Sequence, residues 1–66
     1  MKNYTTPVKV EILSKNGKKS FVYRCEKIGT KKVLFFATNE DNKRLTSNLF
    51  ARKYDAVNIS RQYLNN

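Results

Sequence analysis

The chain lacks the side chains on which most catalytic and metal sites depend. It has no histidine and one cysteine, and five acidic residues stand against 14 lysines and arginines. Zinc sites draw on several histidine or cysteine ligands, and acid–base catalysis draws on a histidine or on paired carboxylates. The five carboxylates of this chain are scattered along the sequence. We therefore expect no enzyme, no bound metal and no cofactor.

Glycine and cysteine are scarce, and each scarcity excludes a class of structure. The two glycines, Gly17 and Gly29, both fall in turn sequences, so no glycine-rich phosphate loop is available. A single thiol cannot form an internal disulfide, and we expect Cys25 to be a buried apolar side chain in a reducing compartment. No signal peptide or membrane-length apolar run is recognised, which favours a cytoplasmic location. No motif of a known family is identified.

Positive charge is what the chain has in excess. Its formal net charge is +9 over 66 residues, which is typical of proteins that bind polyanions, nucleic acid above all. A highly charged surface that serves solubility alone is the plain alternative. Lysine outnumbers arginine and asparagine is abundant, a bias typical of A/T-rich coding sequences such as those of bacteriophages.

The length predicts a single domain, 1–66, with a small core. Residues 1–6 and 65–66 are expected to be frayed. Neither disulfides nor a metal can reinforce so small a core, so association with a partner is expected to do so. We therefore predict a homodimer.

Three segments of alternating apolar residues, 8–13, 21–28 and 33–38, predict an antiparallel meander. Asn16-Gly17 between the first two is the strongest short hairpin signal, because a type I′ turn needs positive φ at both central residues. Gly29-Thr30 between the next two is expected to form a type II′ turn. Two-residue loops at these positions fix every pair in both hairpins. The expected pairs are Lys15–Lys18, Ile12–Phe21, Val10–Tyr23, Val8–Cys25, Cys25–Leu34 and Tyr23–Phe36.

This register divides the apolar residues between two faces of the sheet. The inner face, on which a helix is expected to pack, carries Val8, Val10, Ile12, Phe21, Tyr23, Cys25, Leu34 and Phe36. The outer face carries Lys9, Glu11, Val22, Arg24, Glu26, Val33 and Phe35. A slip of one residue in either turn would reverse these assignments.

The period changes after the third segment. Thr38-Asn39-Glu40-Asp41 resembles a capped helix N-terminus and predicts a helix from there to about Asp55. The alternative is a hairpin loop at 39–42, a short strand at 43–46 and a shorter helix. Residues 57–64 alternate as a strand. The predicted fold is α+β, a small β-β-β-α-β domain with a mainly antiparallel four-stranded sheet and one helix packed on one face.

The outer face suggests a nucleic-acid interface, because Phe35 lies opposite Arg24 on a sheet with lysine-rich turns. An exposed aromatic ring beside cations is typical of proteins that stack single-stranded bases, so RNA or single-stranded DNA is favoured. A dimer interface, or cover by a terminal segment, would also explain an apolar outer face. The predicted binding residues are Lys9, Lys18, Lys19, Arg24, Lys31, Lys32, Phe35, Arg44, Arg52 and Arg61.

A protein partner is the second hypothesis for the function. A phage-type inhibitor or adaptor that binds an acidic surface of a host defence or toxin protein would have the same charge, since basic residues steer association with acidic surfaces. Composition does not separate this hypothesis from nucleic-acid binding.

Overall fold

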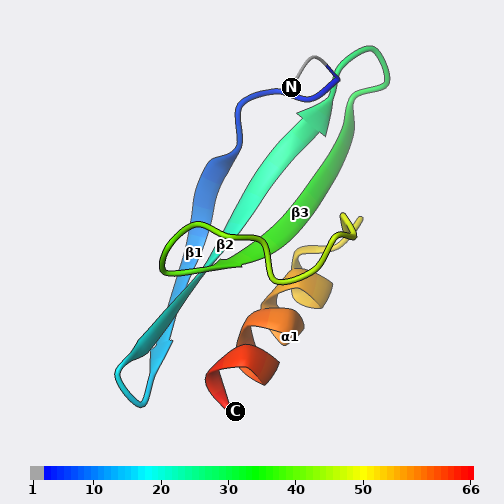
Figure 1. Ribbon diagram of the computed structural model, residues 1–66. Helices are drawn as coiled ribbons and strands as arrows, with labels where there is room; N and C mark the ends of the chain where they lie inside the picture. Colours follow the sequence, from blue (N-terminus) through cyan, green and yellow to red (C-terminus); the bar gives the residue numbers. More distant parts are fainter. Residues whose placement is uncertain (1–2) are drawn as a thin grey trace.

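The computed structural model describes residues 3–66, which form an α+β fold of three antiparallel strands and one helix (Figure 1). The strands β1 (Val8–Lys15), β2 (Lys18–Lys27) and β3 (Lys32–Asn39) lie in the order β1-β2-β3, and the helix α1 spans Lys53–Leu64. The predicted class and meander are confirmed. The fourth strand predicted at 57–64 is wrong, because those residues belong to α1.

The first hairpin closes as its sequence predicts. Asn16 has φ 55° and Gly17 has φ 78°, the positive values that a type I′ turn requires at both central residues. Lys15 pairs with Lys18, and Ile12 pairs with Phe21. The tight turn therefore sets the register of this half of β1.

A bulge then changes the register in the other half of β1. The ladder shifts between Lys9 and Glu11, so Lys9 pairs with Tyr23 and Val8 pairs with Arg24. The predicted pairs of Val10 with Tyr23 and of Val8 with Cys25 are therefore wrong. An extra residue in one strand exchanges the faces of the residues beyond it. As a result, Lys9 shares a face with Tyr23.

The second hairpin keeps its predicted register with a longer loop. Cys25 pairs with Leu34, and Tyr23 pairs with Phe36. The ladder ends at Lys27 and Lys32, so the loop is 28–31 and the predicted two-residue turn is wrong. The backbone N–H groups of Thr30 and Lys31 both donate to the carbonyl of Lys27, at 3.3 and 3.2 Å between N and O. Compared with the predicted turn at Gly29-Thr30, the loop is longer by one residue on each side, so the register of the strands stays the same.

Helix α1 packs on the face of the sheet that was predicted to point outward. Val22, Ala37 and Ala56 form the buried core, each at most 1% exposed. The expectation of a helix on the opposite face is wrong, and cover by a terminal segment is what occurs. Small residues explain why α1 packs on this face, because Ala37 on the sheet and Ala56 on the helix let the two backbones approach closely. The partly buried side chains around this core are Leu13, Phe35, Leu45, Phe50, Val57 and Ile59.

A pair of buried serines joins α1 to the sheet. The Oγ atoms of Ser20 on β2 and Ser60 on α1 lie 2.7 Å apart, and Ser20 Oγ also lies 2.7 Å from the carbonyl oxygen of Thr38. Both serines are fully buried. A hydroxyl donates once and accepts as well, so a Ser60 proton donated to Ser20 and a Ser20 proton donated to Thr38 satisfy both groups.

The segment that was predicted to begin a helix forms a turn instead. The side-chain oxygen of Asn39 accepts from the backbone N–H groups of Asp41 and Lys43, at 2.9 and 3.0 Å between N and O. Asparagine uses the same short acceptor to cap helices and to close turns, so the sequence signal is shared by both structures. The helix predicted from Asn39 is wrong, and the alternative loop at 39–42 is confirmed.

The chain then returns along β3 before the helix begins. Leu45 donates its N–H to the carbonyl of Ala37, and Phe35 and Phe50 exchange two backbone hydrogen bonds of 2.7 and 2.8 Å. We call residues 43–50 the return segment. Its bridges to β3 are isolated, so it extends the sheet without forming a fourth strand. The alternative of a short strand at 43–46 is therefore realised only as a bridge at Arg44.

The residues at both ends of the described chain make hydrogen bonds. Thr5 N–H donates to the carbonyl of Glu26, and Ile28 N–H donates to that of Asn3, both at 2.9 Å. Within the stretch 1–6 that was expected to fray, Asn3 and Thr5 are thus hydrogen-bonded, and residues 1–2 lie outside the described part. At the other end, Asn65 and Asn66 accept hydrogen bonds from lysines of the first hairpin. Within residues 3–66, the helix is too short and polar to cross a membrane.

Candidate nucleic-acid interface

Three aromatic rings lie on the side of the sheet away from α1. They belong to Phe21 and Tyr23 on β2 and Phe36 on β3, and all three are partly exposed. The rings of Tyr23 and Phe36 are stacked, with centroids 5.3 Å apart and planes inclined by 17°. Their direct pairing across the ladder sets this geometry, because opposite residues on neighbouring strands project side by side.

A lysine lies over the first of these rings because of the bulge in β1. The Lys9 ammonium nitrogen is 3.8 Å from the centroid of Phe21 and 5.9 Å from that of Tyr23. Without the shift in register, Lys9 would have pointed to the side that α1 covers. A cation within about 6 Å of a ring is attracted by its electron-rich face. The bulge therefore adds positive charge to an aromatic surface.

An arginine lies over the other end of the ring series. The guanidinium carbon of Arg44 is 5.1 Å from the centroid of Phe36. The guanidinium also donates to the backbone oxygens of Ser47 and Asn48, at 2.9 and 3.3 Å. Those bonds hold the cation in place and leave further N–H groups for a ligand, since a guanidinium has five. We call the surface formed by Lys9, Phe21, Tyr23, Phe36 and Arg44 the aromatic face.

The turn after β3 is tied to the aromatic face by a tyrosine hydroxyl. Tyr23 Oη donates to the side-chain oxygen of Asn42, at 2.7 Å. The bond explains why a tyrosine is suited to this face, because its ring stacks while its hydroxyl reaches a polar partner. Cys25 lies further along β2 on the same side and is 3% exposed. Burial raises the pKa of this thiol, against a smaller lowering by Arg44 and then Arg24.

The turn between β1 and β2 and the C-terminal end of α1 lie toward the same end of the molecule (Figure 1). Two of the predicted binding residues, Lys18 and Lys19, begin β2 at this turn. Lys18 Nζ donates to the carbonyl oxygen of Tyr63 at 3.2 Å and lies 4.9 Å from the centroid of its ring. A cation stabilises the negative end of the helix dipole, so Lys18 has a structural partner there. Its neighbour Lys19 is exposed at the same turn.

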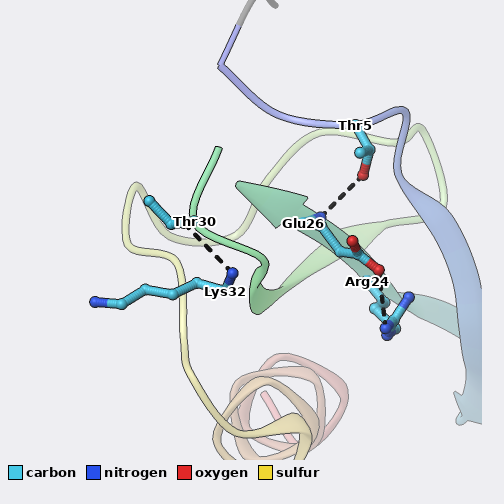
Figure 2. Close-up of polar contacts among 5 residues, drawn as sticks. All are labelled: Thr5, Arg24, Glu26, Thr30 and Lys32. Atoms are coloured by element: carbon cyan, nitrogen blue, oxygen red, sulfur yellow. Dashed lines mark hydrogen bonds and ion pairs between the residues drawn. The ribbon is translucent and has the colours of Figure 1, made fainter. Parts of the chain in front are cut away.

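The other predicted cations lie apart from the aromatic face. Lys31 and Lys32 are exposed at the loop between β2 and β3, where the Lys32 N–H donates to Thr30 Oγ1 (Figure 2). Arg52 is exposed at the N-cap position of α1, and Arg61 is exposed in its last turn. The structure therefore places Lys9 and Arg44 on the same face of the sheet, over different rings, and places these other cations at the two ends of the sheet and on the helix.

The predicted pair of Phe35 and Arg24 does not form an exposed stacking site. Phe35 is partly buried against the core beneath α1, so the expectation that it lies on an uncovered face of the sheet is wrong. Arg24 forms an ion pair with Glu26, with 3.3 Å between the guanidinium nitrogen and the carboxylate oxygen (Figure 2). The predicted face was reversed, and with it the identity of the exposed rings.

The rings of the aromatic face were missed because they form the more apolar side of the predicted sheet. One sequence signal could have identified them: Ser20 and Ala37 lie on the opposite side, where a helix can approach closely. Among residues 3–66, no three cysteine, aspartate or glutamate side chains gather closely enough to hold a metal ion.

No family model, curated protein or solved structure matches this chain in comparisons with known proteins.

Proposed function

We propose that the protein binds single-stranded nucleic acid, RNA or DNA, through the aromatic face. The observation that carries the proposal is the stacked pair of Tyr23 and Phe36 between two cations, Lys9 and Arg44. Every base has a flat π surface, so exposed rings bind bases with little dependence on sequence. The adjacent cations neutralise phosphates and extend the contact from base to backbone.

The shape and charge of the molecule support an extended ligand. The described residues span 40 × 20 × 18 Å, with the strands along the long axis (Figure 1). Lysines flank both turns in the sequence. The net charge of +9 supplies attraction along that length. A strand lying on the aromatic face would meet Lys19 toward one end and Lys31 or Lys32 toward the other.

Single strands are favoured over duplexes because of what the rings need. A base in a duplex is already stacked on both sides, whereas an unpaired base exposes its surface to an aromatic side chain. The helix has its buried side, formed by Ala56, Ser60 and Leu64, packed on the sheet, so that side is not available to enter the groove of a duplex. The exposed rings lie on a sheet surface, and such a surface can contact the bases of an unpaired strand more readily than the groove of a duplex.

The proposal also includes a homodimer, with a different interface from the one that the sequence suggested. The predicted interface residue Val22 is 0% exposed beneath α1, so that surface is used within the chain. Strand β1 is the alternative, because β2 is its one neighbour in the described sheet. Val8 and Ile12 on β1 are each 60% exposed. An edge strand with exposed apolar residues favours pairing with a second copy.

Binding of fluorescent oligo(U) and oligo(dT) over a series of salt concentrations tests the function. The logarithm of the association constant is expected to fall with log salt at about −0.7 per phosphate contact. Tyr23→Leu is expected to weaken binding by about 1–3 kcal/mol at an unchanged slope, the cost of a lost base stack. Lys9→Ala is expected to flatten the slope.

Tyr54→Leu is the matched control, since Tyr54 is 65% exposed on α1 and lies away from the aromatic face. Equal losses from Tyr23→Leu and Tyr54→Leu would refute the aromatic face as the site. Absence of binding by either oligonucleotide at low salt would refute the function itself. An acidic protein surface would then be the partner to test.

A further inference from the structure

A cavity of about 440 Å³ adjoins the aromatic face at the Phe36 end. Cys25 on β2 and Phe36 on β3 contribute to its lining. Tyr4 and Pro7 line it from the N-terminal segment, and Leu49 lines it from the return segment. Three separate parts of the chain thus enclose one largely apolar space. Its volume lies within the range of about 300–1,000 Å³ that is usual for small-molecule sites.

The lining of the cavity also has polar groups suited to an anion. Arg44 and Ser47 complete the lining, and Arg44 is the cation that lies over Phe36. The ring of Phe36 therefore belongs both to the stacked pair and to the cavity. A flat apolar group in the cavity would contact its apolar lining, with any attached phosphate near Arg44. A nucleotide has this combination of a flat base and a phosphate.

We propose that the cavity receives one unstacked base of a bound single strand, while Arg44 holds an adjacent phosphate. This inference rests on the proposed function and adds a specific site to it. Enzymes that extrude a base hold it in a closely fitting pocket between aromatic and apolar side chains, so the lining has the right chemistry. A base enclosed in this way is contacted at its edges, which gives one position along the strand a preference among bases.

The single thiol of the chain reports directly on occupancy of the cavity. Cys25 is the one cysteine among the 66 residues and contributes to the lining. Its modification by a small thiol reagent can be followed by intact mass at mildly alkaline pH, without a variant. Oligo(U) at ten times its dissociation constant is expected to slow the reaction about tenfold, because about one protein in ten remains free. An abasic strand of equal length, bound to the same extent, is expected to slow it far less.

A variant that adds volume to the lining of the cavity gives a second and independent measurement. Ser47→Leu is expected to weaken oligo(U) binding by about tenfold, the effect of a lost base stack, and to leave abasic-strand binding unchanged. Ser14→Leu is the matched control, since Ser14 is an exposed serine that lines a different hollow beside Leu13 and Arg61.

The outcomes separate this inference from the proposed function. Failure of every strand to bind would refute both. Binding of oligo(U) with no base-dependent protection of Cys25 would overturn the cavity alone and leave the aromatic face in place. A thiol that does not react in the free protein at any pH at which the fold is intact would show a cavity closed to small molecules, which also overturns the inference. Equal affinities for Ser47→Leu and Ser14→Leu would contradict it by a separate route.

Discussion

Single residues with unusual backbone angles fix the ends of the strands. Gly17 has φ +78°, and an added Cβ there would meet no atom within 4 Å. Gly17→Ala is therefore expected to destabilise the fold through the backbone alone, by about 1–2 kcal/mol. Chemical denaturation measures this change. A loss much below that range would show that the hairpin turn relaxes to another type.

The buried serines lead to a second prediction at this scale. Ser20 Oγ contacts both Ser60 Oγ and the Thr38 carbonyl, whereas Ser60 Oγ contacts only Ser20 Oγ among these groups. The two alanine variants should therefore differ in unfolding free energy. Ser60→Ala is expected to cost about 1 kcal/mol of unfolding free energy, and Ser20→Ala about 2 kcal/mol because it also leaves the Thr38 carbonyl without this donor. Equal costs would contradict the arrangement in which Ser20 joins the helix to β3.

The pH dependence of Cys25 is a third prediction. Burial raises the pKa of this thiol above its ordinary value of 9.0, so the neutral form is favoured in the folded state. Its contribution to stability is complete below the pKa of the unfolded chain and is lost as pH rises through the folded pKa. The modification rate is therefore expected to have its midpoint above pH 9.0. A midpoint below that value would show a stabilised thiolate.

Packing between elements depends on small side chains at one contact. Ala56 on α1 is 0% exposed and meets Val22 and Ala37. Ala56→Leu adds volume where none is free, and such overpacking typically costs about 1–3 kcal/mol. Ala51→Leu is the control, because Ala51 is exposed just before the helix. Thermal unfolding of both variants measures the difference, and equal melting temperatures would contradict close packing of α1.

The bulge in β1 has a functional consequence at the same scale. It places Lys9 over Phe21, on the side away from α1. On the helix side, Glu11 pairs with Val22 and forms an ion pair with Lys53 at 2.9 Å. Because of the one extra residue, β1 presents Lys9 to the rings on one side of the sheet and Glu11 to the helix on the other.

At the scale of the whole molecule, association through β1 is the main prediction. The wild-type protein is expected to sediment as a dimer at micromolar concentration, and Ile12→Lys is expected to give a monomer by placing charge on the edge strand. Ile28→Lys is the matched control, since Ile28 is 58% exposed and Ile12 is 60% exposed. A wild-type monomer, or equal effects of the two changes, would contradict the β1 interface.

Local chemistry determined the three strands. Asn16-Gly17 sets its turn and the pair of Ile12 with Phe21, and the alternation of β2 and β3 sets the pair of Tyr23 with Phe36. These features depend on neighbouring residues and on the two-residue alternation of apolar side chains, and both can be recognised in the sequence. The excess of lysine and arginine likewise determined a cationic molecule, whatever its fold.

Tertiary contacts decided which side of the sheet is covered, and therefore which rings form the candidate site. Both sides are apolar enough to be a core, so periodicity alone could not choose between Val22 and Tyr23. The choice came from distant residues: Ala56 and Ser60 fit against Ala37 and Ser20, where small side chains allow close approach. The same long-range packing made 57–64 helical, since Ala56, Ser60 and Leu64 form one buried stripe at a spacing of four.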